Sequence, residues 1–502
     1  MSKIVFINPA PNEFWNSKLL NLLKGKRQAF LPRLSAMIFA ALTPEKHSFT
    51  YVDEEIGSVD YNMEADLVAI TAMTKQAVRA YLIAGEFRKR GIPVIIGGIH
   101  AGTRSEEVSG HCDAVMIGEG ENTWPAMLED FENGALKKVY DAKDYPPVEK
   151  LVSPRIDIIN PDHYVMYPLQ ATRGCPYDCE FCSIKYSTGH KYRTKPVEQV
   201  VAEIREYEKV NTRQFSGVVR KGYYFTDDNI YVDREYLKKL LTAIKPLGII
   251  WEAEGSANVA DDDEILQLMG ESGCRTFSIG FESVNPNSLS EANKPKVNKV
   301  EQYHETIAKL AKYGIIPGGN FVVGFDSDDV TVFETMLDFI KNSDLAFVIV
   351  SILTPYPGTR LYERMKPRIF ETDSRFYDSW QATFTPRNMT AQELQIGWYW
   401  MGTQFTDLDF MWTQMKKYWN YGPWKNIPVL TLRERLLLII TAIVLGMHGM
   451  FKYQKFLWRA AFYPKTTDFN QLIWNMRRLE MSSNGPAVRN PADKYRERGV
   501  TE

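Results

Sequence analysis

The sequence predicts an α/β protein built from two successive parallel sheets, followed by a mainly helical C-terminal region. Three observations support this prediction. Short apolar runs alternate with segments of helical periodicity over the first 130 residues, and the same alternation returns from about residue 166 to residue 365. Residues 375–480 are instead rich in aromatic side chains, helical in pattern and poor in strand signals. A chain of 502 residues is long enough for two to four domains with sizeable cores.

The first block is expected to contain five buried strands. Residues 74–90, between the third and the fourth, have helical periodicity. Small and polar residues follow several of the expected strands, and the carboxyl ends of parallel strands share one edge, where open α/β sheets bind ligands. We therefore expect one cofactor or nucleotide to lie across this edge. The expected strands are Ile4–Asn8, Phe49–Asp53, Leu67–Thr71, Val94–Gly97 and Ala114–Ile117.

A linker is expected before the second block, because Pro146, Pro147, Pro154 and Pro161 interrupt residues 136–165. Strands and helices then alternate again, which predicts a second parallel α/β unit. Its six expected strands are Tyr167–Thr172, Gly222–Thr226, Ile249–Glu254, Thr276–Gly280, Gly318–Val323 and Ala346–Ile352.

Three of the five cysteines, Cys175, Cys179 and Cys182, follow the first of these strands within eight residues. This density predicts a shared metal or cluster. An iron–sulfur cluster is favoured over structural zinc, because a closed zinc site needs four protein ligands and no fourth is nearby. A zinc knuckle or an inert group of thiols is the alternative. The solitary Cys274 is expected to pack as a small buried hydrophobic residue at the start of the fourth strand.

The cysteine loop resembles the signature of the radical S-adenosylmethionine enzymes, including an aromatic residue, Phe181, before the last cysteine. The resemblance implies a 4Fe–4S cluster with one open iron, which binds S-adenosylmethionine and cleaves it to a 5′-deoxyadenosyl radical. It also implies a partial (β/α)6 barrel with catalytic groups at the carboxyl ends of its strands. Residues in matching strand-end motifs would contact S-adenosylmethionine. They are Asp227, Asp228, Glu282, Ser283 and Asn320, and Phe181 of the cysteine loop is expected to contact it too.

The first block resembles the cobalamin-binding domain that precedes the barrel in cobalamin-dependent members of this group. The resemblance is carried by residues 97–100 and 113–121. An Asp-x-His-x-x-Gly motif is absent, so we expect no histidine ligand on the lower face of cobalt. One alternative is a Rossmann-like fold that binds no cobalamin. For His100, the alternative to a cofactor role is an ordinary polar contact. The residues expected near cobalamin are Asn8, Thr71, Gly97, Gly98, His100, Gly118, Glu119 and Glu121.

The resemblance divides the chain into four parts. A Rossmann-like cobalamin-binding domain covers residues 1–135, a linker 136–165, the partial barrel 166–370 and a helical region 371–502. The expected activity is methylation of an unactivated carbon, with S-adenosylmethionine, cobalamin and the cluster as cofactors. The alternatives are an oxidative cyclase acting on a tetrapyrrole or membrane lipid, and a non-catalytic iron–sulfur or cobalamin sensor. A methylthiotransferase is disfavoured, because the first block holds only Cys112.

The C-terminal region contains nine basic residues and one acidic residue between Met411 and Lys465, together with four tryptophans. The uncharged run Leu436–Phe451 is shorter than the roughly 20 residues needed to span a bilayer. The pattern fits an element resting on anionic lipid, or equally a buried helix with a basic outer face. The first alternative predicts a hydrophobic substrate, such as a lipid or isoprenoid, met at the inner face of the membrane.

The composition and the first residues indicate where in the cell the protein acts and which partners it binds. The chain carries a net charge of −2 and has no recognition motif for nucleic acid, so we expect no nucleic-acid partner. The first residues read as a buried strand rather than a signal peptide, and an oxygen-sensitive cluster suits a reducing cytoplasm. A radical enzyme of this kind is expected to receive electrons from a donor such as ferredoxin or flavodoxin.

Overall fold

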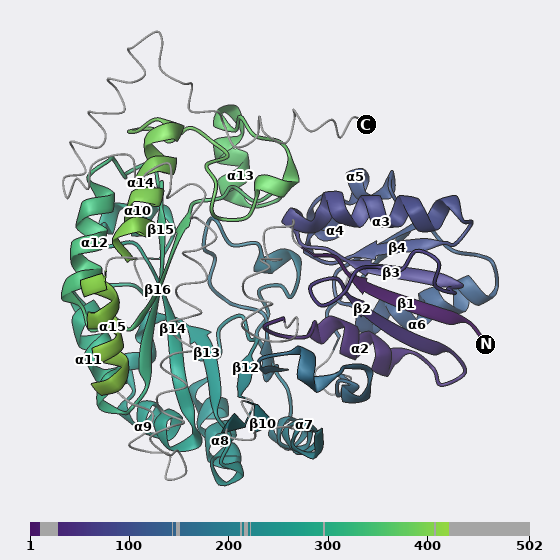
Figure 1. The fold of residues 1–502 in the computed structure, drawn as a ribbon, viewed down its shortest axis with the longest axis horizontal. Helices are drawn as coiled ribbons and strands as arrows, with labels where there is room; N and C mark the ends of the chain where they lie inside the picture. Colours follow the sequence, from purple (N-terminus) through teal and green to yellow (C-terminus); the bar gives the residue numbers. More distant parts are fainter. Residues whose placement is uncertain are drawn as a thin grey trace. The chain divides into compact units, whose positions relative to one another are not determined.

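The computed structural model describes the first parallel sheet, the second parallel sheet and the start of the helical region (Figure 1). Both sheets belong to the same compact unit of the chain. The described residues are 1–10, 29–142, 144–146, 151–210, 213–214, 219–220, 222–294, 297–405 and 408–420.

The first sheet is parallel throughout, with strand order β2-β1-β3-β4-β5-β6. Its strands are β1 (Lys3–Asn8), β2 (Ser48–Asp53), β3 (Leu67–Thr71), β4 (Val94–Gly97), β5 (Ala114–Ile117) and β6 (Val139–Asp141). Its helices are α2 (Leu34–Leu42), α3 (Ala77–Lys89), α4 (Ile99–Thr103), α5 (Ser105–Ser109) and α6 (Gly120–Glu132). All five expected strands are present. The strand order reverses between β1 and β3, and in open α/β sheets such a switch point opens a crevice at the carboxyl edge.

Helices cover both faces of this sheet because its strands are apolar on both sides. Val5 and Ile7 of β1 pack with Phe87 of α3, whereas the alternate residues Ile4 and Phe6 pack with Trp124 of α6. Strand β6 was not predicted and lies within residues 136–165. It is three residues long and buries only Tyr140, so it leaves almost no periodic signal in the sequence.

The second sheet contains every strand expected of it, in chain order and with parallel neighbours. The strands are β7 (Tyr167–Leu169), β12 (Tyr223–Phe225), β13 (Trp251–Gly255), β14 (Cys274–Glu282), β15 (Ile316–Val323) and β16 (Phe347–Ile352). The helices that follow them in sequence are α7 (Val197–Val210), α8 (Arg234–Ile244), α9 (Asp263–Ser272), α10 (Pro286–Glu291), α11 (Tyr303–Lys312), α12 (Val332–Asn342) and α13 (Arg360–Met365). Strands β7 and β16 are the two ends of this sheet and do not pair with each other, so the barrel is partial, and the expected α/β class is confirmed.

The strand expected at residues 167–172 is split in two. Strand β7 ends at Leu169, and β8 (Thr172–Arg173) then pairs in antiparallel fashion with β9 (Arg193–Thr194). This small ribbon carries the cysteine loop between its strands. A second short antiparallel pair joins β10 (Arg213–Gln214) and β11 (Val219–Arg220). Cys274 is the first residue of β14 and is fully buried, as predicted.

Two helices follow the barrel, α14 (Ala391–Phe405) and α15 (Leu408–Asn420). Trp398 of α14 donates a hydrogen bond to the carbonyl of Val350 in β16 at 2.7 Å, which anchors this helix to the end of the sheet. The apolar run Leu436–Phe451 and most of the basic residues counted above lie outside the described residues. Among the helices that the structure describes, none is long and apolar enough to cross a membrane.

Candidate functional site

The cysteine loop begins at Gly174, directly after β8. Gly174 has a φ of +84°, and a Cβ there would lie 2.4 Å from the carbonyl oxygen of Lys191, so only glycine fits. The backbone then turns, with the amide of Cys182 donating to the carbonyl of Cys179 at 3.2 Å. All three thiols are half-buried and free of disulfides. Burial raises the pKa of Cys179 and of Cys182 to about 11, so the thiols must lose protons when they bind iron.

The three thiols suit a cluster better than a single ion. Within the described part of the chain, no group of three or more His, Cys, Asp or Glu side chains is arranged to hold one metal ion. In a cubane each cysteine binds a different iron, so its ligands lie farther apart than those of a single zinc. The thiols are still close enough to raise one another's pKa through charge repulsion. The donor set therefore fits a 4Fe–4S cluster.

Lys294 is a site residue that the sequence analysis missed. Its ammonium group lies 2.5 Å from a carboxylate oxygen of Glu282. The negative charges of Glu282, Cys179 and Cys182 together raise its pKa, although burial opposes this rise. The signal available in the sequence was a basic residue shortly after the Glu-Ser pair. Glu282 itself has a φ of +63°, a strained conformation that turns the chain at the carboxyl end of β14.

The paired aspartates that follow β12 brace the cysteine loop. Asp227 accepts hydrogen bonds from the hydroxyl of Thr172 at 2.6 Å and from the amide of Ala171 at 3.2 Å. Asp228 accepts from the amide of Gly174 at 2.8 Å and from the hydroxyl of Thr188 at 2.6 Å. Burial raises the pKa of Asp227 to about 7 and also raises that of Asp228. These carboxylates thus hold both ends of the loop in place.

The remaining predicted contacts to S-adenosylmethionine differ in their surroundings. Asn320 pairs in register with Gly280, and its side-chain oxygen is buried without a hydrogen-bond partner in the described part of the chain. Such an orphaned acceptor fits a donor group on a bound ligand. Ser283 is fully buried and accepts from the amide of Asn285 at 3.0 Å. The ring of Phe181 lies edge-on to Phe325, with centroids 6.4 Å apart.

The predicted cobalamin residues gather at the carboxyl edge of the first sheet. Asn8 is buried, donates to Asp53 at 2.9 Å and accepts from Arg33 at 3.0 Å. Gly98 has a φ of +93°, and a Cβ there would lie 2.7 Å from the carbonyl oxygen of Ala72. This glycine is therefore required by the neighbouring backbone. Thr71 and Gly97 end paired strands at the same edge, and Gly118 follows β5 with a φ of +80°.

Glu119 and Glu121, also predicted near cobalamin, form ion pairs with the barrel. Arg173, at the start of the cysteine loop, lies 2.8 Å from Glu119 and 2.6 Å from Glu121. Arg193 of β9 also pairs with Glu119. All four side chains are less than one-tenth exposed. The carboxyl edge of the first sheet is thereby joined directly to the loop that carries the three cysteines.

Comparisons with known proteins agree with this geometry. Residues 169–340 match the family model of the radical SAM superfamily. The chain is 33% identical, over 72% of its length, to 79% of the bacteriochlorophyllide d C-12(1)-methyltransferase of Chlorobaculum tepidum. It is 30% identical, over 82% of its length, to 90% of the bacteriochlorophyllide d C-8(2)-methyltransferase of the same organism.

Less similar relatives include a hopanoid C-2 methylase of Rhodopseudomonas palustris, 26% identical over 69% of this chain and 67% of that protein. An anaerobic magnesium-protoporphyrin IX monomethyl ester cyclase of Rubrivivax gelatinosus is 23% identical over 66% of this chain and 64% of that protein. Among solved structures, the cobalamin-dependent S-adenosylmethionine radical enzyme OxsB superposes with a TM-score of 0.64, covering 96% of this chain and 75% of that one at 14% identity. The likeness to OxsB shows a shared fold.

Proposed function

Because this chain belongs to the cobalamin-dependent radical S-adenosylmethionine enzymes, we propose that it transfers a methyl group to an unactivated carbon of a hydrophobic tetrapyrrole. The two relatives of highest identity named above are both methyltransferases of bacteriochlorophyllides. They favour a tetrapyrrole over the lipid or isoprenoid that the C-terminal region suggested. The hopanoid methylase among the relatives keeps a lipid as the second candidate.

The observation that carries the proposal is the buried ion pairing of Arg173 with Glu119 and Glu121. It joins the cysteine loop to the carboxyl edge of the first sheet, which is the ligand-binding edge of such sheets. A cluster held by the cysteine loop and a ligand bound at this edge would therefore face the same interface. Transfer of a methyl group to a substrate radical requires such proximity, because misplacing reacting atoms by about 1 Å can cost roughly a hundredfold in rate.

We assign roles to the residues of the barrel as follows. Cys175, Cys179 and Cys182 would hold the cluster, while Glu282 and Asn320 offer acceptors for the amino groups of S-adenosylmethionine. Lys294 would balance the negative charge of the thiolates and of a ligand carboxylate. Bound cofactors supply the radical and methyl-transfer chemistry, and the chain's own residues position them and exclude water.

At the first sheet, we propose that cobalamin lies over the carboxyl edge formed by Asn8, Thr71, Gly97 and Gly118. No histidine follows β1 in the described residues, so a histidine ligand to cobalt from that loop is not part of the proposal. Electrons would come from a small reducing protein such as ferredoxin or flavodoxin. We also propose that the C-terminal region contacts the inner face of the membrane, because its sequence is basic and aromatic.

The test is anaerobic reconstitution with iron, sulfide and hydroxocobalamin, followed by reduction with S-adenosylmethionine and a chlorophyllide. Methylation predicts 5′-deoxyadenosine, S-adenosylhomocysteine and a product heavier by one CH2. An oxidative cyclase, the alternative supported by the less similar relative, would give 5′-deoxyadenosine without S-adenosylhomocysteine and a product that has lost hydrogen or gained oxygen. A protein that cleaves no S-adenosylmethionine when reduced would instead be a sensor.

Replacing any one of the three cysteines by alanine is expected to abolish cluster loading and turnover. Iron content and visible absorbance measure the cluster independently of activity. Cys274→Ala is the matched control, because Cys274 is buried in β14 and has no expected role in the cluster. An active Cys179→Ala protein with a full cluster would contradict the ligand assignment.

A further inference from the structure

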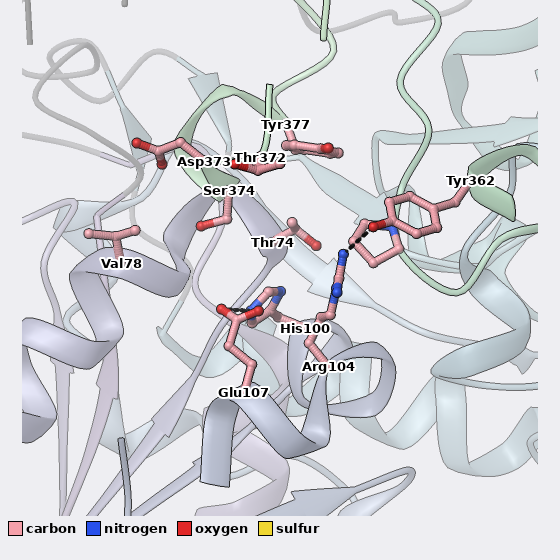
Figure 2. A pocket seen from close by; sticks show the side chains of 11 residues that line it. Thr74, Val78, His100, Arg104, Glu107, Tyr362, Thr372, Asp373, Ser374 and Tyr377 are labelled. Carbon is pink, nitrogen blue, oxygen red and sulfur yellow. Dashed lines mark hydrogen bonds and ion pairs between the residues drawn. The ribbon is translucent and has the colours of Figure 1, made fainter. Parts of the chain in front are cut away.

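A cavity of about 250 Å³ lies beside the carboxyl edge of the first sheet and is lined by both halves of the enzyme (Figure 2). Thr74, just before α3, His100 and Arg104 of α4 and Glu107 of α5 come from the first half. Tyr362 of α13 and Ser374 come from the segment that follows the last barrel strand. The cavity is therefore a separate feature from the cysteine loop and from the predicted S-adenosylmethionine residues.

Arg104 lines this cavity without a carboxylate partner. Among the residues that the structure describes, no acidic oxygen comes within 4 Å of its guanidinium. Its guanidinium donates a hydrogen bond to the hydroxyl of Tyr362 at 2.5 Å and stands 5.1 Å from the centre of that ring. A guanidinium is always charged and presents five N–H donors. The remaining donors of Arg104 are thus available to an anion.

His100 adds a second unsatisfied group. Its side chain is 2% exposed, and Nε2 lies 3.0 Å from the hydroxyl oxygen of Tyr81. The same hydroxyl lies 2.9 Å from Glu107, and a carboxylate can only accept, so Tyr81 donates to Glu107 and accepts from His100. Nδ1 is buried without a partner in the described part of the chain. Figure 2 shows the His100 ring between the side chains of Glu107 and Arg104.

The charges permit an anion at this position. Glu107 is the acidic group closest to His100, with an oxygen 3.6 Å from Nε2, and the proximity of His100 lowers the pKa of Glu107. Asp373 also lines the cavity, but its carboxylate is held by the guanidinium of Arg375. Among the residues that the structure describes, Arg104 is therefore the cation of this cavity that has no carboxylate partner.

We propose that this cavity binds an oxyanion, a phosphate or a carboxylate, carried as an arm of a larger ligand. Pockets that enclose whole drug-sized ligands usually measure roughly 300–1,000 Å³, so this cavity suits a substituent and not a macrocycle. Thr74 and Ser374 supply hydroxyl donors beside Arg104 and His100. The inference rests on the proposed function, which offers two sources of the oxyanion: the phosphodiester in the nucleotide loop of cobalamin, and a side-chain carboxylate of a tetrapyrrole.

The experiment compares four ligands with the full-length apoprotein. Hydroxocobalamin and dicyanocobinamide, which lacks the phosphodiester, test the first source. Pyropheophorbide a and its methyl ester test the second. Affinities are measured by absorbance or fluorescence titration for the wild type, Arg104→Gln, Arg104→Lys and Arg155→Gln. The last variant is the matched control, because Arg155 pairs with Asp157 and does not line the cavity. Circular dichroism and thermal melting verify that each variant folds.

Arg104→Gln should weaken binding of one oxyanionic ligand by roughly ten- to a hundredfold, the range for a hydrogen bond to a charged group. Its uncharged counterpart should bind as before. Arg104→Lys should recover part of the loss, and Arg155→Gln should bind like the wild type. A loss for cobalamin alone identifies the phosphodiester, and a loss for the chlorin acid alone identifies the carboxylate.

Equal losses for charged and uncharged ligands, or unchanged affinities in a folded Arg104→Gln protein, would overturn this inference alone. A wild-type protein that binds neither cobalamin nor the chlorin acid would overturn the proposed function, and the inference with it.

Discussion

Lys294 illustrates how single buried charges organise the site. Its side chain is 12% exposed, and its ammonium group lies near one carboxylate and two thiols. A buried ion costs several kcal/mol to desolvate, and this cost is offset only when its partner and its hydrogen bonds are in place. Glu282 provides that partner in the apoprotein, and cluster thiolates would add further negative charge.

Lys294→Met is expected to lower the free energy of unfolding of the apoprotein by about 3–5 kcal/mol, because Glu282 is left as an unpaired buried charge. Denaturant unfolding measures this loss. The double variant Lys294→Met with Glu282→Gln should recover most of it, since no net charge remains buried. A single variant as stable as the wild type would refute the importance of this pair.

Glu252 of β13 is a second buried ionisable residue, and its effect on the stability of the fold depends on pH. Burial raises the pKa of Glu252 to about 7, and the hydrogen bond that its carboxylate accepts from the hydroxyl of Thr276 is long, at 3.4 Å. The folded protein therefore binds this proton more tightly than the unfolded chain. The stability that the protonated Glu252 contributes is fully present below about pH 4.5 and is lost as the pH rises through about 7.

Glu252→Gln should therefore be more stable than the wild type at pH 8 and nearly equal to it at pH 5. The gain at pH 8 is at most roughly 3 kcal/mol, at about 1.4 kcal/mol per pKa unit. Thermal or denaturant unfolding of both apoproteins at the two pH values measures it. A difference independent of pH would show that Glu252 is already ionised in the folded protein at pH 5, and would contradict the raised pKa.

At the scale of elements, Asp228 connects the two ends of the segment between β8 and β9. One of its oxygens serves both the amide of Gly174, before the first cysteine, and the hydroxyl of Thr188, after the last. The turn after β12 thus determines the shape of a loop from another part of the chain.

Asp228→Ala should lower the iron bound after reconstitution by severalfold, because each hydrogen bond to a charged group contributes about 1.5–3 kcal/mol to the loop's conformation. Asp233→Ala is the control: Asp233 caps α8 by accepting from the amide of Tyr236 at 2.9 Å. Loss of this cap should cost about 1 kcal/mol of stability and leave iron binding unchanged. Equal iron content in both variants would contradict the bracing role.

The strands were predictable because each carries its own signal. Leu67–Thr71 and Val94–Gly97 are short apolar runs, and their bounds in the structure match those expected. Strand β6 was missed because pairing with β5, and not its own sequence, makes it a strand. The ribbon of β8 and β9 was missed for the same reason, since each strand is only two residues long.

At the scale of the whole molecule, buried ion pairs make one structure of two sheets. Arg173 and Arg193 contact Glu119 across the junction, and Arg104 contacts Tyr362, which is 258 residues away in sequence. A ligand bound at the carboxyl edge of the first sheet would therefore stabilise the barrel as well.

Cobalamin added to the full-length protein should raise the unfolding temperature of a single cooperative transition. At a concentration about 100 times Kd, binding to the native state alone contributes about 2.7 kcal/mol. Differential scanning calorimetry measures the shift, and Glu119→Gln should reduce the coupling by leaving Arg193 unpaired. Two separate transitions, of which cobalamin shifts only one, would contradict this coupling.

The two parallel sheets, the cysteine triad and the family follow from the sequence alone. Apolar periodicity and a contiguous cysteine motif are local properties, and local properties are readable along a chain. The roles of the polar residues depend instead on contacts that form when the chain folds. A carboxylate accepts from any donor brought near it, so Glu119 and Glu121 were expected beside a cofactor and are found paired with arginines. Partners such as Arg104 and Tyr362 meet only once the chain has folded, because nothing in either local sequence encodes the other.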